Sequence, residues 1–197
     1  MDQRSLDNIA TLIPAVQDKA RDFMGAIAES RRLPDGWYVS IISALRTYHE
    51  QDILYAQGRT TTGPVVTDAP AGWSNHNFGT AFDLGIFNDA GQYIDDLPDR
   101  GLMTQHDVSN YYCLLAPIGK ALGLTWGGDW ESIDDEPHYE LQLWPDLSEE
   151  ENLAKLRALH DAGLPISADA TPPARVVAVA APSGGQASPT SNAIAKK

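Results

Sequence analysis

The chain has 197 residues, of which 43 % are hydrophobic, 8 % aromatic and 21 % charged, a composition typical of a globular protein with one full core. Fourteen Lys and Arg residues against 27 Asp and Glu residues give a formal net charge of −13, which disfavours binding to nucleic acid or to anionic lipid. No apolar run approaches the roughly 20 residues that span a bilayer, and a single cysteine excludes an internal disulfide. We therefore expect a protein that binds neither nucleic acid nor membrane.

The first half of the chain alternates helical and strand patterns. Apolar residues from 9 to 27 recur at three- and four-residue steps, which predicts one amphipathic helix ending before Pro34. Residues 38–42 alternate in the manner of a strand, and residues 47–56 return to helical spacing. Residues 81–87 predict a further strand.

The second half continues with both kinds of element. Residues 111–122 predict a helix, and residues 138–143 a short strand. Ser148 and Glu151 form a capping-box pattern that opens a last helix, which runs to residue 163. Because no βα unit repeats, we predict an α+β fold with a central, largely antiparallel sheet flanked by helices.

The composition changes near residue 165. Residues 165–197 are rich in Pro, Ala and Ser and contain no aromatic side chain, so they cannot bury enough apolar area to offset the entropy lost on ordering. We predict one folded domain over residues 1–164 and a disordered tail over residues 165–197.

Two of the five histidines have a carboxylate at a spacing typical of metal ligands. His76 is followed seven residues later by Asp83, and His138 is preceded by Asp135. Two histidines and one carboxylate are a common ligand set for catalytic zinc, which leaves one position for water. Asp135 would then remain free to take a proton from that water. Spacing alone leaves open a structural, hydrogen-bonded His and Asp pair.

The sequence around these residues resembles the zinc peptidoglycan peptidases, a family that includes VanY-type D-alanyl-D-alanine carboxypeptidases and L-alanyl-D-glutamate endopeptidases of phage endolysins. The family's acid-x-x-His pattern is matched by Asp135 and His138. Residues 51–60 resemble its Gln-x-x-Leu-Tyr-x-Gln-Gly-Arg-Thr helix end, and residues 126–130 (Trp-Gly-Gly-Asp-Trp) favour the endopeptidase branch. The family's Ser-x-His-x-x-Gly-x-Ala-x-Asp pattern is matched by Ser74, His76, Gly79, Ala81 and Asp83.

The resemblance, which covers about residues 9 to 143, implies a hedgehog/D,D-peptidase-like zinc peptidase fold. It implies one Zn²⁺ ion bound by His76, Asp83 and His138. Asp135 would be the general base and later the proton donor to the leaving amine. Arg46, at the family's preceding arginine, would hold the oxyanion or a substrate carboxylate, with a surface ion pair as its structural alternative.

Three further residues are candidates for contact with the stem peptide of peptidoglycan. They are Gln51, Arg59 and Ser74, although the first two also suit a helix end and the third a turn. Glu140 lies on the same strand face as His138, and we expect it to fix the imidazole tautomer.

The expected activity is zinc-dependent cleavage of the L-alanyl-D-glutamate bond in stem peptides. The alternatives are a D-alanyl-D-alanine carboxypeptidase and, from another class, a non-catalytic zinc-containing module that binds the cell wall. The first residues lack the apolar stretch of a secretory signal, which predicts synthesis in the cytoplasm. A monomer would then reach the periplasmic wall as an endolysin released through a holin, or as an injected effector paired with an immunity protein.

Overall fold

The computed structural model describes residues 1–131 and 133–172 and contains helices around one sheet. Strands β1 (Tyr38–Ser43), β2 (Ala81–Phe87), β3 (Thr125–Trp126) and β4 (His138–Glu140) form an antiparallel sheet in the order β1-β2-β4-β3. The α-helices are α1 (Gln3–Ala10), α2 (Pro14–Ser30), α3 (Tyr48–Ala56), α4 (Gln105–Ala121) and α5 (Glu149–Asp161). Short 3-10 helices are η1 (Asn75–Phe78), η2 (Ile94–Asp96), η3 (Pro98–Arg100) and η4 (Gly127–Asp129). The expected α+β class with an antiparallel sheet is confirmed.

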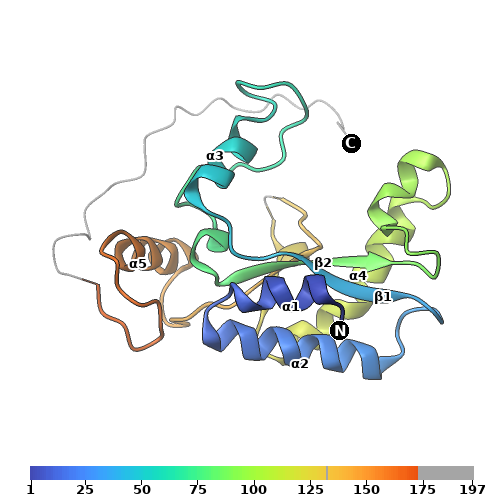
Figure 1. Cartoon of the computed structure of the whole chain (residues 1–197), viewed down its shortest axis with the longest axis horizontal. Coiled ribbons are helices and arrows are strands. Elements are labelled where there is room, and N and C mark those ends of the chain that lie inside the picture. The colour runs from blue at the N-terminus through green and yellow to red at the C-terminus, as the bar shows by residue number, and fades with distance from the viewer. Residues whose placement is uncertain (132, 173–197) are drawn as a thin grey trace.

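The main hydrophobic core lies between the sheet and three helices. Figure 1 shows α1 and α2 side by side along the sheet, while α3 projects away from it and α5 lies at one end. Helix α2 contacts both α4 and β1, and α4 contacts β3, so the helices close over the apolar strands. The largest fully buried side chains of this core are Ile9, Phe23, Ile41, Phe82, Leu84, Ile86, Ile94, Tyr112, Leu115 and Tyr139.

The single helix expected over residues 9–27 is wrong, because the chain forms two helices there. Helix α1 ends at Ala10, and Pro14 occupies the first position of α2. Proline has no N–H to donate and its ring clashes with the preceding turn, so it favours the start of a helix over its interior. The apolar period continues across the break because both helices pack on one core.

Most other elements agree with the sequence patterns, and the differences lie at their ends. Helix α4 begins at Gln105, earlier than expected, because Thr104 and Asp107 form a capping box. Strand β4 ends at Glu140, and β3 has only two residues, which is too short to leave a periodic pattern.

A second, smaller cluster packs beside the main core. Phe78 of η1 is buried there with Leu143 and Leu156, and Ile166 packs against them. Trp144 Nε1 also donates a hydrogen bond of 2.7 Å to the Ala168 carbonyl. The first residues after 164 therefore contact the body of the protein. Residues 173–197 lie outside the described part, and the division at residue 164 stays a prediction.

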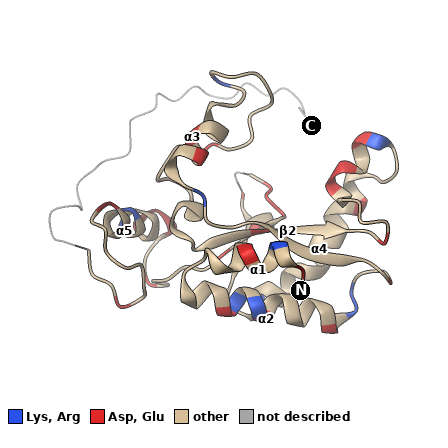
Figure 2. Cartoon of the chain, in the orientation of Figure 1, with Lys and Arg blue, Asp and Glu red and all other residues tan. Residues whose placement is uncertain are grey.

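The described helices and strands carry more acidic than basic residues, as the composition of the whole chain does (Figure 2). Basic residues occupy separate short stretches of the ribbon among more numerous acidic ones (Figure 2). Among the described residues, none of the helices combines the length and the apolar character needed to cross a bilayer.

Candidate active site

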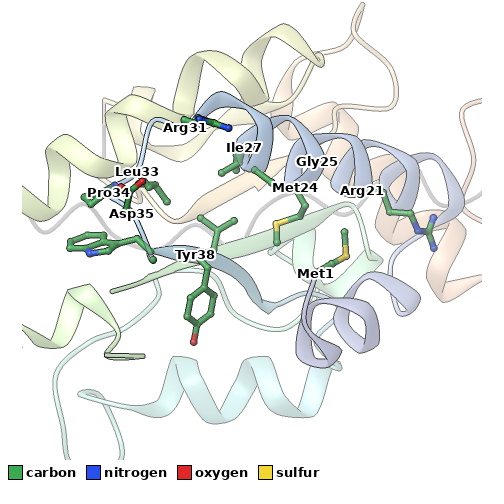
Figure 3. Close-up of a pocket in the computed structure, with 14 residues that line it drawn as sticks. Met1, Arg21, Met24, Gly25, Ile27, Arg31, Leu33, Pro34, Asp35 and Tyr38 are labelled. Atoms are coloured by element: carbon green, nitrogen blue, oxygen red, sulfur yellow. The ribbon is translucent and has the colours of Figure 1, made fainter. Parts of the chain in front are cut away.

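Two hollows in the described part of the chain differ in their chemistry. One, of about 540 Å³, lies between α2 and the start of β1, where Met24 and Ile27 line it with other apolar side chains (Figure 3). Of the described residues around it, Asp35 is the one acid and none is a histidine. The other, of about 880 Å³, is lined by both predicted metal-binding histidines together with Asp83 and Asp135. The second hollow, here called the groove, is therefore the candidate active site.

The sheet and one 3-10 helix bring the predicted metal ligands together. Asp83 in β2 is the direct antiparallel partner of His138 in β4, so both side chains leave the same face of the sheet. His76 lies in η1, which begins after Ser74 and ends before Gly79. Gly79 has φ 66°, a left-handed conformation that favours glycine, and there the chain turns into β2.

Three donor atoms converge at this point. His76 Nε2 and His138 Nδ1 lie 3.1 and 3.2 Å from Asp83 Oδ1, and the two nitrogens are 3.2 Å apart. On the outer side of each ring, His76 Nδ1 donates to the Ala44 carbonyl at 2.7 Å, and His138 Nε2 donates to Glu140 at 3.0 Å. When both rings are neutral, these outer bonds use their only N–H groups, so three lone pairs face one another. The residues therefore fit a cation, and the donor types suit zinc.

The charges around this point also favour a cation. Burial acts to raise the pKa of Asp83, but the facing His76 and His138 hold it well below its usual range. Burial acts to lower the pKa of His138, but hydrogen bonds to Asp83 and Glu140 outweigh it and raise the pKa to about 10. Asp83 is thus ionised, and the histidine beside it attracts a positive partner, either a proton or a metal ion.

Asp135 reaches the groove through a tight turn in which His138 N–H donates to the Asp135 carbonyl at 3.1 Å. Gly127 lies directly against this turn, and a Cβ atom there would collide with that carbonyl oxygen. A Cβ atom on Gly128 would collide with the ring of Trp126. These contacts explain both glycines of the Trp-Gly-Gly-Asp-Trp motif. Burial raises the pKa of Asp135 against the opposing charge of His138, which suits a group that takes up a proton.

Arg46 lines the groove and is held by its neighbours. Its Nη1 donates to Gln51 Oε1 at 2.8 Å, its Nη2 donates to Ser43 Oγ at 3.2 Å, and Nη2 lies 3.9 Å from Asp83 Oδ2. Gln51 is 0 % exposed, and its Nε2 donates to the Ala69 carbonyl at 2.7 Å. The contacts of Gln51 therefore hold Arg46, and direct contact of Gln51 with a substrate stays a prediction.

The other two predicted substrate contacts lie in different places. Ser74 lines the groove, and its Oγ accepts the N–H of His76 at 3.3 Å. Arg59 is not among the residues that line the groove. Its guanidinium donates to the Thr67 carbonyl at 2.8 Å and pairs with Asp68 at 2.5 Å, which closes the loop after α3. A substrate contact at Arg59 stays a prediction.

Trp130, a candidate from the sequence either for groove lining or for the core, lines the groove, and its ring centroid is 4.9 Å from that of His138. Several other groove residues were not predicted from the sequence. They come from several separate segments and occupy no fixed position of a recognised motif. Among them are Asp68, Trp73, Asn75, Tyr93, Ile133, Glu149, Glu150 and Leu153.

Comparison with known proteins matches the same region of the chain. A model of the D-alanyl-D-alanine carboxypeptidase family, a branch of the M15 peptidases, matches residues 67–141. Over 130 residues the chain is 38 % identical to the peptidoglycan L-alanyl-D-glutamate endopeptidase CwlK of Bacillus subtilis, a match that covers 66 % of this chain and 73 % of that protein. The chain belongs to the M15 peptidase family. The family expected from the motifs is therefore confirmed.

Two solved structures are more distantly similar. The L-Ala D-Glu endopeptidase ChiX of Serratia marcescens shares 18 % identity with a TM-score of 0.44, and the match covers 72 % of this M15 chain and 88 % of that one. The D,D-pentapeptidase VanY, solved as a variant with Zn(II), shares 16 % identity with a TM-score of 0.45 over 78 % of this chain and 80 % of that one.

Proposed function

We propose that this M15 peptidase is a zinc-dependent hydrolase that cleaves the L-alanyl-D-glutamate bond of peptidoglycan stem peptides. The observation that carries the proposal is the convergence of His76, Asp83 and His138 beside Asp135 in one groove. The 38 % identity to an L-alanyl-D-glutamate endopeptidase supports the choice of bond.

Zinc is the proposed cofactor, as one ion bound by His76, Asp83 and His138. Such an ion supplies a Lewis acid that polarises the scissile carbonyl and lowers the pKa of water towards about 7. The Ala44 carbonyl and the Glu140 carboxylate orient the two imidazoles for this role, because each accepts the ring N–H that points away from Asp83.

Asp135 and Arg46 are the proposed catalytic residues. A carboxylate oxygen of Asp135 takes a proton from the attacking water and later returns it to the nitrogen of the leaving amine. The Arg46 guanidinium, held by Gln51 and Ser43, faces the negative charge that develops on the carbonyl oxygen or a substrate carboxylate. Ser74 lies on the groove wall, where it would contact the stem peptide.

A D-alanyl-D-alanine carboxypeptidase is the second candidate. The family model that matches residues 67–141 carries that activity in its description. A non-catalytic wall-binding module, by contrast, has no use for a proton acceptor and a guanidinium beside the metal ligands, whereas Asp135 and Arg46 both line the groove.

Digestion of purified muropeptides followed by mass spectrometry tests the proposal. We expect products cut between L-alanine and D-glutamate, loss of cleavage after treatment with a chelator, and recovery when zinc is restored. Release of terminal D-alanine alone would establish the carboxypeptidase instead. Cleavage that continues unchanged after metal removal would contradict the zinc mechanism.

The biological setting is also part of the proposal. The protein acts as a monomer on the cell wall, where holin release and injection into a rival cell are two routes for an enzyme made in the cytoplasm. The second route requires an immunity protein in the producing cell. Deleting the immunity protein separates the two routes. Producing cells that lack it should be killed by their neighbours if the enzyme is injected, and should survive if it is released only through a holin.

A further inference from the structure

Glu140 is a buried carboxylate that accepts hydrogen bonds from two side chains. It ends β4 and is 6 % exposed, so its charge needs polar partners. His138 Nε2 donates to Glu140 Oε2 at 3.0 Å, and Asn75 Nδ2 donates to the same oxygen at 2.6 Å. One oxygen atom therefore links an imidazole of the metal site to an amide on η1.

The direction of this carboxylate decides how His138 is presented. While Glu140 Oε2 accepts the proton on Nε2, the lone pair on Nδ1 of His138 points towards Asp83 and the proposed zinc ion. A carboxylate that turned away would leave the ring free to change its orientation or tautomer. The Asn75 amide is the second bond that holds Glu140 Oε2 in place.

Asn75 is itself fixed in the orientation that this contact needs. Thr80 Oγ1 donates to the Asn75 carbonyl at 3.1 Å and lies 3.4 Å from Asn75 Oδ1. Thr80 is fully buried, and Asn75 is half-buried at the start of η1. Because an ionised Glu140 carboxylate can only accept hydrogen bonds, the NH₂ group of Asn75 faces Glu140 and its side-chain oxygen faces the Thr80 hydroxyl.

We propose that Asn75 is a positioning residue that acts on His138 through Glu140 and so strengthens zinc binding. The inference rests on the zinc site of the proposed function. Asn75 occupies an unspecified position of the Ser-x-His-x-x-Gly-x-Ala-x-Asp pattern, so the motif assigns it no role. Because Asn75 also lines the groove, direct contact with the substrate is the competing role that the experiment must separate.

A double-mutant cycle on zinc affinity tests the link. The dissociation constant of zinc is measured by competition with a chelator for the wild type, Asn75→Ala, Glu140→Ala and the double variant. Loss of a group that orients a metal ligand weakens binding by about 10–100-fold, so we expect about 10-fold or more for Glu140→Ala and somewhat less for Asn75→Ala. In the Glu140→Ala background, Asn75→Ala should change the constant by less than about 2-fold, because the group through which it acts is gone.

A second measurement does not depend on whether Glu140→Ala folds. In the zinc-loaded protein, the Nε2 proton of His138 is followed by NMR. We expect its exchange with water to be several-fold faster in Asn75→Ala than in the wild type. Asn88→Ala is the matched control, since the Asn88 amide donates to Gln92 in a turn outside the groove, and it should leave both readouts unchanged.

Equal zinc affinity in Asn75→Ala and the wild type would overturn the inference, as would the same loss with and without Glu140. A raised KM for the stem peptide with unchanged zinc affinity would assign Asn75 to substrate binding and also overturn it. These outcomes leave the proposed function intact, whereas a wild type that binds no zinc would overturn both.

Discussion

The main core and the smaller cluster hold the candidate metal site in different ways. Asp83 and His138 lie on adjacent strands above the main core, and the sheet register places them opposite each other. His76 lies on η1, where Phe78 is buried in the smaller cluster with Leu156 of α5. The three proposed ligands thus meet where two packing units join. Two of them depend on a sheet, and the third depends on how a short helix is anchored.

Removing the charge of the proposed ligand Asp83 or of the proposed proton acceptor Asp135 should have the largest effects. Asp83→Asn keeps the shape of the side chain but removes a charged ligand from the sheet, so we expect loss of zinc and a fall in cleavage of about 1000-fold or more, equivalent to about 4 kcal/mol. Asp135→Asn removes only the proton acceptor, so we expect about 100-fold slower cleavage with zinc retained. Metal content per chain and the rate of stem-peptide cleavage are measured together. An Asp135→Asn protein without zinc would show that Asp135 is a ligand.

Shortening the chain tests the smaller cluster with an intermediate effect. A chain that ends at residue 164 lacks Ile166 and the Ala168 carbonyl that Trp144 contacts, whereas a chain that ends at residue 172 keeps both. We expect the first to be about 1–3 kcal/mol less stable towards unfolding than the second. Urea denaturation of the two proteins provides the comparison. Equal midpoints would support a domain that ends at residue 164.

Acid titration of two helix caps should give the smallest effect. Hydrogen bonds within capping boxes lower the pKa of Glu151 at the start of α5 and of Asp107 at the start of α4. Each carboxylate therefore stabilises the folded protein at neutral pH, and this contribution is lost as the pH falls towards the lowered pKa. We expect Glu151→Gln and Asp107→Asn each to reduce the free energy of unfolding at about pH 7, and to match the wild type only at a pH below the lowered pKa of the carboxylate that is replaced.

The caps also distinguish the two regions. Helix α5 packs on η1, so Glu151→Gln should weaken zinc binding slightly, whereas Asp107→Asn on the main core should not. Zinc affinities of the two variants at neutral pH provide the measurement. Equal effects would mean that the two regions act as one unit.

Features that lie within one strand or one motif could be predicted from the sequence better than features that depend on packing between segments. Asp83 and His138 lie on one face of the sheet because they are paired on adjacent strands, an arrangement that strand alternation and motif spacing make accessible to prediction. The turn of Gly127 against Asp135 explains a motif that was recognised only as a pattern. Helix ends were harder to predict. The apolar period continues across the break between α1 and α2 at Pro14, and the capping box at Thr104 starts α4 before its apolar period begins.

By itself, the sequence predicted the composition of the candidate site, namely two histidines, a proposed ligand carboxylate and a proposed proton acceptor within two short motifs. Only the tertiary structure decided how these groups are held. Gln51 holds Arg46, Asn75 donates to Glu140 across 65 positions, and Arg59 holds a loop whose residues Thr67 and Asp68 line the groove. Local spacing records which groups share a strand or a turn. Hydrogen bonds between distant segments have no signature in local spacing, because their donors and acceptors meet only when the segments pack together.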